Sequence, residues 1–119
     1  MDTKFIIEQM VLLIPLMVAG GEIEQAKDTI RRMLKNAIEI DKAAVVRYKH
    51  FTDELLDLRE EAVRLEDADA VHGIDADLAD FSVKKKERLS LLKQERADMA
   101  SLTSAKTSND LIEILRHLA

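Results

Sequence analysis

The residues best suited to bind a cation lie in one acidic stretch near the middle of the chain. Five aspartates and one histidine fall there within fourteen residues: Asp67, Asp69, His72, Asp75, Asp77 and Asp80. Carboxylate oxygens are the ligands that Ca²⁺ and Mg²⁺ prefer. An EF-hand loop, however, needs a glycine where His72 stands and a bidentate glutamate at its end, and this stretch has neither. We therefore expect these aspartates to cap helices and to face solvent, with no bound metal.

Two histidines are paired with glutamates at helical spacing. His50 precedes Glu54 by one turn, and Glu113 precedes His117 by one turn. Di-iron sites in helical bundles need a Glu-x-x-His motif on two helices and two further glutamates, and no such motif occurs. The chain also has no cysteine, which excludes thiolate metal sites and disulfides. We expect no metal and no cofactor.

The sequence contains none of the short motifs that carry common enzyme chemistry. Phosphate-binding glycine loops, dinucleotide fingerprints, nucleophile elbows and His-Glu-x-x-His are all absent. Three glycines and short connections leave little loop from which to build a cleft. We expect a protein that is not an enzyme.

One basic stripe is the strongest hint of nucleic-acid binding. Lys27, Arg31 and Lys35 recur every four residues, with Arg32 and Lys42 nearby. The chain as a whole is acidic, with a formal charge of −5, and no aromatic residues interleave with the stripe. A solvated helix face is favoured, and a small nucleic-acid-associated regulator remains an alternative.

These side chains must be positioned by helices, and the longest predicted helix covers about residues 22–70. It contains no glycine or proline, and its apolar residues repeat with heptad spacing from Ile23, Ala26 and Ile30 onward. The pattern slips at Ala44 to Tyr48, which predicts a stutter. Further apolar residues widen the stripe, so we expect a bundle rather than a bare coiled coil.

The segment 1–19 is predicted to be an apolar helix that ends at Gly20-Gly21. It is too short to span a bilayer, and Glu8 and Gln9 interrupt its apolar run. Pro15 is expected to kink it or to end it early. Burial in the bundle or against another subunit is favoured over a secretory signal or a membrane anchor, which remain the alternatives.

The long helix is predicted to turn back near Gly73 into an antiparallel helix over residues 76–102. Asp75 or Asp77 would cap that helix. A polar linker would then lead to a last helix over 109–119, capped by Ser108 or Asn109, with Leu111, Ile114, Leu115 and Leu118 on its inner face.

A fold-back at Gly73 also predicts charge pairing along the two-helix arm. It sets Lys84, Lys85 and Lys86 beside Glu60 and Glu61. Exposed pairs of this kind contribute only about 0–1 kcal/mol each, so they would select the register more than they stabilise the fold.

These elements predict a single all-α domain, an elongated helical bundle in which a long central helix forms a hairpin with the third helix. The hypothesis for its function is a non-enzymatic, cytoplasmic protein–protein interaction module that forms a homo-oligomer and binds another protein as an assembly, adaptor or inhibitory factor. The expected interaction surface consists of Phe5, Ile6, Met10, Leu13, Met17, Ile23 and Ile30. An exported or membrane-associated helical protein is the other alternative.

Overall fold

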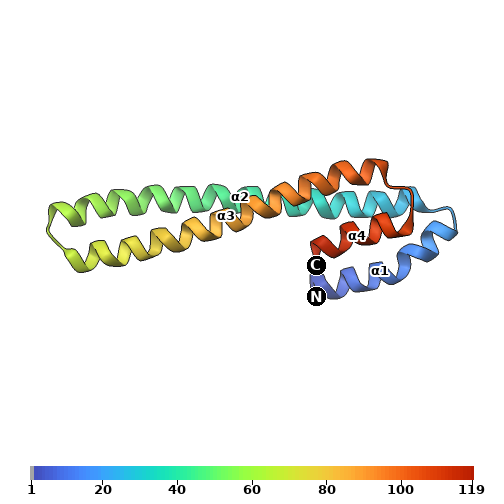
Figure 1. Ribbon diagram of the computed structural model, residues 1–119, viewed down its shortest axis with the longest axis horizontal. Helices are drawn as coiled ribbons and strands as arrows, with labels where there is room; N and C mark the ends of the chain where they lie inside the picture. The colour runs from blue at the N-terminus through green and yellow to red at the C-terminus, as the bar shows by residue number, and fades with distance from the viewer. Residues whose placement is uncertain (1) are drawn as a thin grey trace. The chain divides into compact units, whose positions relative to one another are not determined.

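The computed structural model describes residues 2–119, which form four helices and no strand (Figure 1). The helices are α1 (Thr3–Ala19), α2 (Ile23–Arg64), α3 (Ala68–Ser104) and α4 (Ser108–Leu118). The all-α prediction is confirmed, with a long helix and the third helix in an antiparallel hairpin and a short helix at each end. The chain packs as two compact units, which are described separately.

The four-helix unit comprises the chain up to Glu39 and from Lys93 onward. α1 packs against α4, and each of the four helices contributes to one core. Among the described residues, the largest fully buried side chains all lie in this unit: Ile7, Ile14, Ile30, Leu34, Leu102, Leu111 and Leu115. Burial of each such side chain contributes roughly 1.5–3 kcal/mol. The predicted inner face of α4 is confirmed by this core.

α1 ends as the sequence predicted, at Gly20-Gly21. Gly21 has φ 80, its N–H donates to the Val18 carbonyl, and the Glu22 N–H donates to the Met17 carbonyl. This is a Schellman motif, which needs a left-handed residue at the position of Gly21. The helix continues through Pro15 to Ala19, so the expected early end does not occur.

α4 is capped one residue earlier than predicted. The Thr107 hydroxyl accepts from the Asp110 N–H at 3.2 Å, and the Asp110 carboxylate accepts from the Thr107 N–H at 3.1 Å. Together these bonds form a capping box. Ser108 is therefore the first residue of the helix rather than its cap.

The hairpin unit, Ile40–Leu92, turns at a different place from the one predicted. Its turn is Leu65–Asp67, and Gly73 lies inside α3, which begins at Ala68 rather than at 76. Glu66 takes the left-handed conformation with φ 54. The Asp67 N–H donates to the Ala62 carbonyl, which makes a second Schellman motif without glycine.

Asp67, rather than Asp75 or Asp77, caps the returning helix. Its carboxylate accepts from the Ala70 N–H at 3.1 Å. Asp67 thus completes the Schellman motif of α2 and also caps α3, and the connection Leu65–Asp67 is short, as is typical of helical hairpins.

The earlier turn changes the register of the two helices. Asp41 faces Arg88, Tyr48 faces Phe81, and Arg59 faces Asp75. The predicted pairing of Lys84, Lys85 and Lys86 with Glu60 and Glu61 is therefore wrong. Lys84 pairs instead with Asp80 at 3.0 Å, and Glu61 pairs with Arg64, each within its own helix.

The contact line between the two helices of the hairpin is partly polar. The buried apolar residues along it are Ala44, Ala62 and Leu92, and the Asp41 carboxylate is buried with them. Leu89, next to Arg88 on α3, is 46% exposed. Arg88 takes the inner position, because its guanidinium bonds to Asp41 at 2.6 Å. That hydrogen bond raises the pKa of Arg88.

Candidate interaction surface

α1 buries one face and leaves the opposite face apolar and exposed. Ile7 and Ile14 point into the core of the four-helix unit, with Met10, Val11, Met17 and Val18 partly buried beside them. The other side carries five large apolar residues that are between 38% and 71% exposed: Phe5, Ile6, Leu12, Leu13 and Leu16. We call these five residues the α1 face.

The spacing of the α1 face places its five residues on one side of the helix, with the exposed Gln9 among them. Phe5, Leu12 and Leu16 are seven and four residues apart, and Ile6 and Leu13 are seven apart, so they lie along one side of the helix. Their exposed area is on the order of 500 Å², within the range of about 300–600 Å² that is typical of the largest apolar patch on a monomer and is often functional.

The predicted interaction surface is only partly exposed. Phe5, Ile6 and Leu13 belong to the α1 face, whereas Met10, Met17 and Ile23 pack partly buried against the core. Ile30 is fully buried, because α1, α3 and α4 cover this part of α2, so its inclusion is corrected. Leu12 and Leu16 were missed, although their spacing from Phe5 would have found them.

The basic stripe of α2 is interrupted in the structure. Lys27 is buried at 7% exposure, with its Nζ 4.0 Å from Glu24. Arg31 bonds to Asp28 at 2.6 Å, and Arg32 lies 3.8 Å from the same carboxylate. A continuous row of cations for a phosphate backbone is therefore not formed by these three residues.

The acidic residues of the hairpin have separate roles. Asp67 caps α3, Asp80 pairs with Lys84, and Asp75 accepts two hydrogen bonds from Arg59, at 2.6 and 3.4 Å. The Arg59 guanidinium lowers the pKa of Asp75, and Asp75 raises the pKa of Arg59. Among residues 2–119 no group of three or more His, Asp or Glu side chains is placed to hold a metal ion.

One polar cavity of about 400 Å³ lies between α3 and α4. Asp98, which is 4% exposed, lies in its wall. The Asp98 carboxylate bonds to His117 Nδ1 at 3.0 and 3.1 Å, and it accepts a hydrogen bond from Gln94 at 3.1 Å. His117 thus pairs across helices rather than with Glu113 of its own turn. His50, by contrast, does lie 3.0 Å from Glu54. The Asp98–His117 hydrogen bond therefore links α3 and α4.

No protein-family model, curated protein or solved structure matches this chain. No helix among the described residues combines the length and the apolarity needed to cross a membrane. Among the described residues of the four-helix unit, the large apolar side chains that are exposed are those of the α1 face.

Proposed function

We propose that the chain is a non-enzymatic protein-interaction module that associates with copies of itself and serves as an assembly, adaptor or inhibitory factor. The observation that supports this is the α1 face, on which Leu12 and Leu16 are 68% and 71% exposed. When a partner covers such a surface, the removal of apolar area from water lowers the free energy by roughly 25 cal/mol per Å².

A second copy of the chain is a suitable partner for this face. The exposed side of α1 carries few charges, with Lys4 and Glu8 near its amino end, so a partner surface must itself be largely apolar. The same face on another copy meets this requirement, and two-fold dimers that join identical patches are the commonest oligomers. A cytoplasmic location is part of this proposal and is tested by cell fractionation.

The test replaces exposed leucines of the α1 face without touching the core. Leu12→Gln with Leu16→Gln should keep the helical fold, because both side chains already face solvent. It should weaken self-association by about tenfold or more, because apolar contact area is lost. Sedimentation equilibrium measures the dissociation constant, and circular dichroism checks the fold.

The matched control is Lys35→Gln with Asn36→Gln, two exposed positions on α2 of the same unit. It should leave the dissociation constant unchanged. An unchanged mass in the leucine variant would show that the α1 face is not the association surface, whereas a monomeric native chain would refute self-association altogether.

A further inference from the structure

The hairpin unit carries a second uncovered apolar surface. Ile40, Phe51 and Leu58 on α2, and Leu65 directly after its last residue, are between 42% and 66% exposed. Phe51, Leu58 and Leu65 are seven residues apart, and Ile40 precedes Phe51 by about three turns, so the four lie on one side of the helix. We call them the hairpin stripe. α3 covers them only in part, because a single neighbouring helix can bury only one line of contacts. Phe51, which touches Phe81 of α3, is the least exposed of the four.

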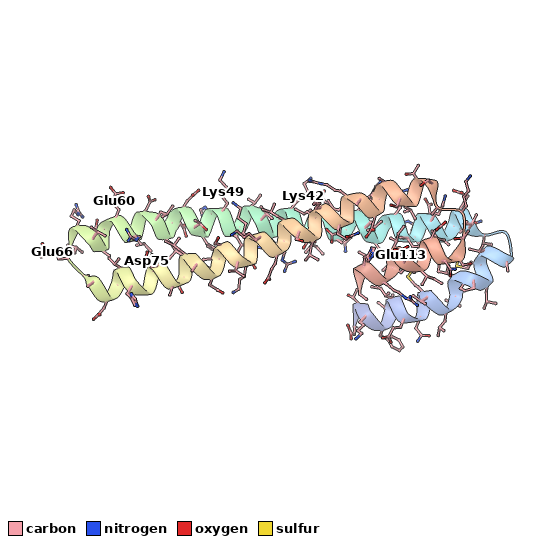
Figure 2. All side chains as sticks on the ribbon, in the orientation of Figure 1. Lys42, Lys49, Glu60, Glu66, Asp75 and Glu113 are labelled. Atoms are coloured by element: carbon pink, nitrogen blue, oxygen red, sulfur yellow. The ribbon has the colours of Figure 1, made fainter. Side chains whose placement is uncertain are left out.

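Charge is strongly divided along the same hairpin. The tip segment, residues 53–80, has eleven acidic and two basic side chains, a net charge of −9. The base segment, residues 40–52 and 81–92, has seven basic and two acidic side chains, a net charge of +5 with histidine neutral. Figure 2 shows Glu66 and Asp75 toward the closed end of the hairpin and Lys42 and Lys49 toward its open end.

We infer that two copies of the chain join through their hairpin stripes with the hairpins antiparallel, so that the acidic tip segment of each copy lies on the basic base segment of the other. This rests on the proposed self-association and names a second surface for it. A parallel pairing would set −9 against −9, and like charges brought together cost several kcal/mol. The antiparallel pairing places the tip segment of each copy, with a net charge of −9, against the base segment of the other, with a net charge of +5.

Phe51 lies at the centre of this arrangement. On α2 the last basic residue of the base segment is Lys49 and the first acidic residue of the tip segment is Asp53, so the charge changes sign at Phe51. Its ring stacks on Phe81 with centroids 5.8 Å apart, and Phe81 also meets Tyr48 at 5.8 Å. A two-fold axis through this point brings the aromatic clusters of the two copies together.

The same axis fixes which charged residues meet. Arg47 lies four residues before Phe51 and Glu54 three residues after it, so both flank the stripe on one side of α2. In an antiparallel pair Arg47 of one copy lies at the level of Glu54 of the other, and the contact occurs twice. Within one copy the two residues are two turns apart, and Glu54 bonds instead to His50 at 3.0 Å.

The available area suits a protein–protein interface of ordinary size. The stripe exposes on the order of 400 Å² of apolar side chain, against about 800 Å² buried per partner in a standard interface. Such interfaces are roughly 56–65% apolar. The stripe supplies most of that apolar share, and the flanking charged side chains supply the polar remainder.

The test is a charge-swap cycle in the full chain carrying Leu12→Gln and Leu16→Gln, so that association through the α1 face is already weakened. Arg47→Glu places Glu against Glu54 of the other copy, and Glu54→Arg places Arg against Arg47. The double variant, Arg47→Glu with Glu54→Arg, restores opposite charges. Each single variant should raise the dissociation constant about tenfold, and the double variant should return to within about threefold of the parent.

Three outcomes overturn the inference. Single variants that associate as the parent does would show that these residues do not face each other, and a double variant weaker than either single would exclude the antiparallel pairing. The parent, which carries Leu12→Gln and Leu16→Gln, could also be monomeric up to about 100 μM although the native chain associates. That result would refute the hairpin interface and would be consistent with association through the α1 face alone. Circular dichroism of each variant verifies that the helices remain.

Discussion

The four-helix unit and the hairpin unit share the two long helices α2 and α3, yet they bury different kinds of side chain. Where α1 and α4 join α2 and α3, leucine and isoleucine side chains such as Leu34 and Leu102 become fully inaccessible. Where α2 and α3 have only each other, the buried residues are alanines, Leu92 and a paired aspartate. The number of neighbouring helices, more than the local sequence, decides how much apolar surface a heptad pattern can bury.

This difference in burial predicts that truncating a leucine lowers the free energy of unfolding more in the four-helix unit than in the hairpin unit. Leu102→Ala and Leu89→Ala remove the same atoms from the same helix, but Leu102 is fully buried and Leu89 is 46% exposed. We expect Leu102→Ala to lower the free energy of unfolding by about 2–5 kcal/mol and Leu89→Ala by about 1 kcal/mol or less. Urea unfolding at matched protein concentration measures both, and equal losses would contradict the comparison.

The polar contact of the hairpin should respond differently from an apolar core. Arg88→Ala leaves the Asp41 carboxylate buried without its guanidinium, and we expect a loss of about 1–3 kcal/mol. The loss should stay below that of a fully buried pair, because the Arg88 side chain is 37% exposed. Asp41→Leu with Arg88→Met should be less destabilised than Arg88→Ala alone, since no unpaired charge remains. A double variant less stable than the single would show that the pair itself holds the hairpin.

The two turns offer a matched pair of smaller effects. Gly21 and Glu66 occupy equivalent left-handed positions in the two Schellman motifs, and a side chain there costs roughly 1–2 kcal/mol. Glu66→Gly should therefore raise the free energy of unfolding by up to about 1 kcal/mol, and Gly21→Ala should lower it by about 1 kcal/mol. Thermal unfolding compares the two, and a destabilised Glu66→Gly variant would show that the glutamate side chain has another role.

The smallest effect concerns the cap of α4 in acid. Backbone N–H groups of Lys106 and Thr107 hold the pKa of Asp110 below its ordinary value. The ionised form therefore stabilises the fold, fully above the ordinary pKa of about 3.9, and this contribution is lost as the pH falls through the lower folded value. Asp110→Asn should flatten the pH dependence of unfolding between about pH 5 and 2. An unchanged pH profile would mean that other carboxylates dominate acid unfolding.

Much of the fold was readable from residue patterns because caps, breaks and apolar spacing are local signals. The end of α1 at Gly20-Gly21 and the inner face of α4 agree with the prediction for this reason. The hairpin turn was misplaced because Gly73 resembles a helix end, whereas the left-handed residue is Glu66, which has no such signal. Gly73 is exposed inside α3, where a glycine costs only about 1 kcal/mol relative to alanine.

The exposed surfaces were harder to predict than the helices. A heptad pattern marks Phe51, Leu58 and Ile30 alike as apolar, but Ile30 is buried by three neighbouring helices and the other two are left exposed. The register of the hairpin depends on the position of its turn, so one misplaced turn also misplaced Lys84, Lys85 and Lys86. Such errors arise from tertiary context, which a single helix does not encode.

The central claim is that the apolar surfaces left open by one copy are covered by another. Sedimentation equilibrium of the native chain from about 1 to 100 μM tests it most directly, because dissociation constants in this range correspond to roughly 5–8 kcal/mol. The account predicts that the average mass is well above the 13.5 kDa of one chain and falls toward that value on dilution. At each concentration the Leu12→Gln, Leu16→Gln variant should have a lower average mass than the native chain. A mass of 13.5 kDa at every concentration would contradict it.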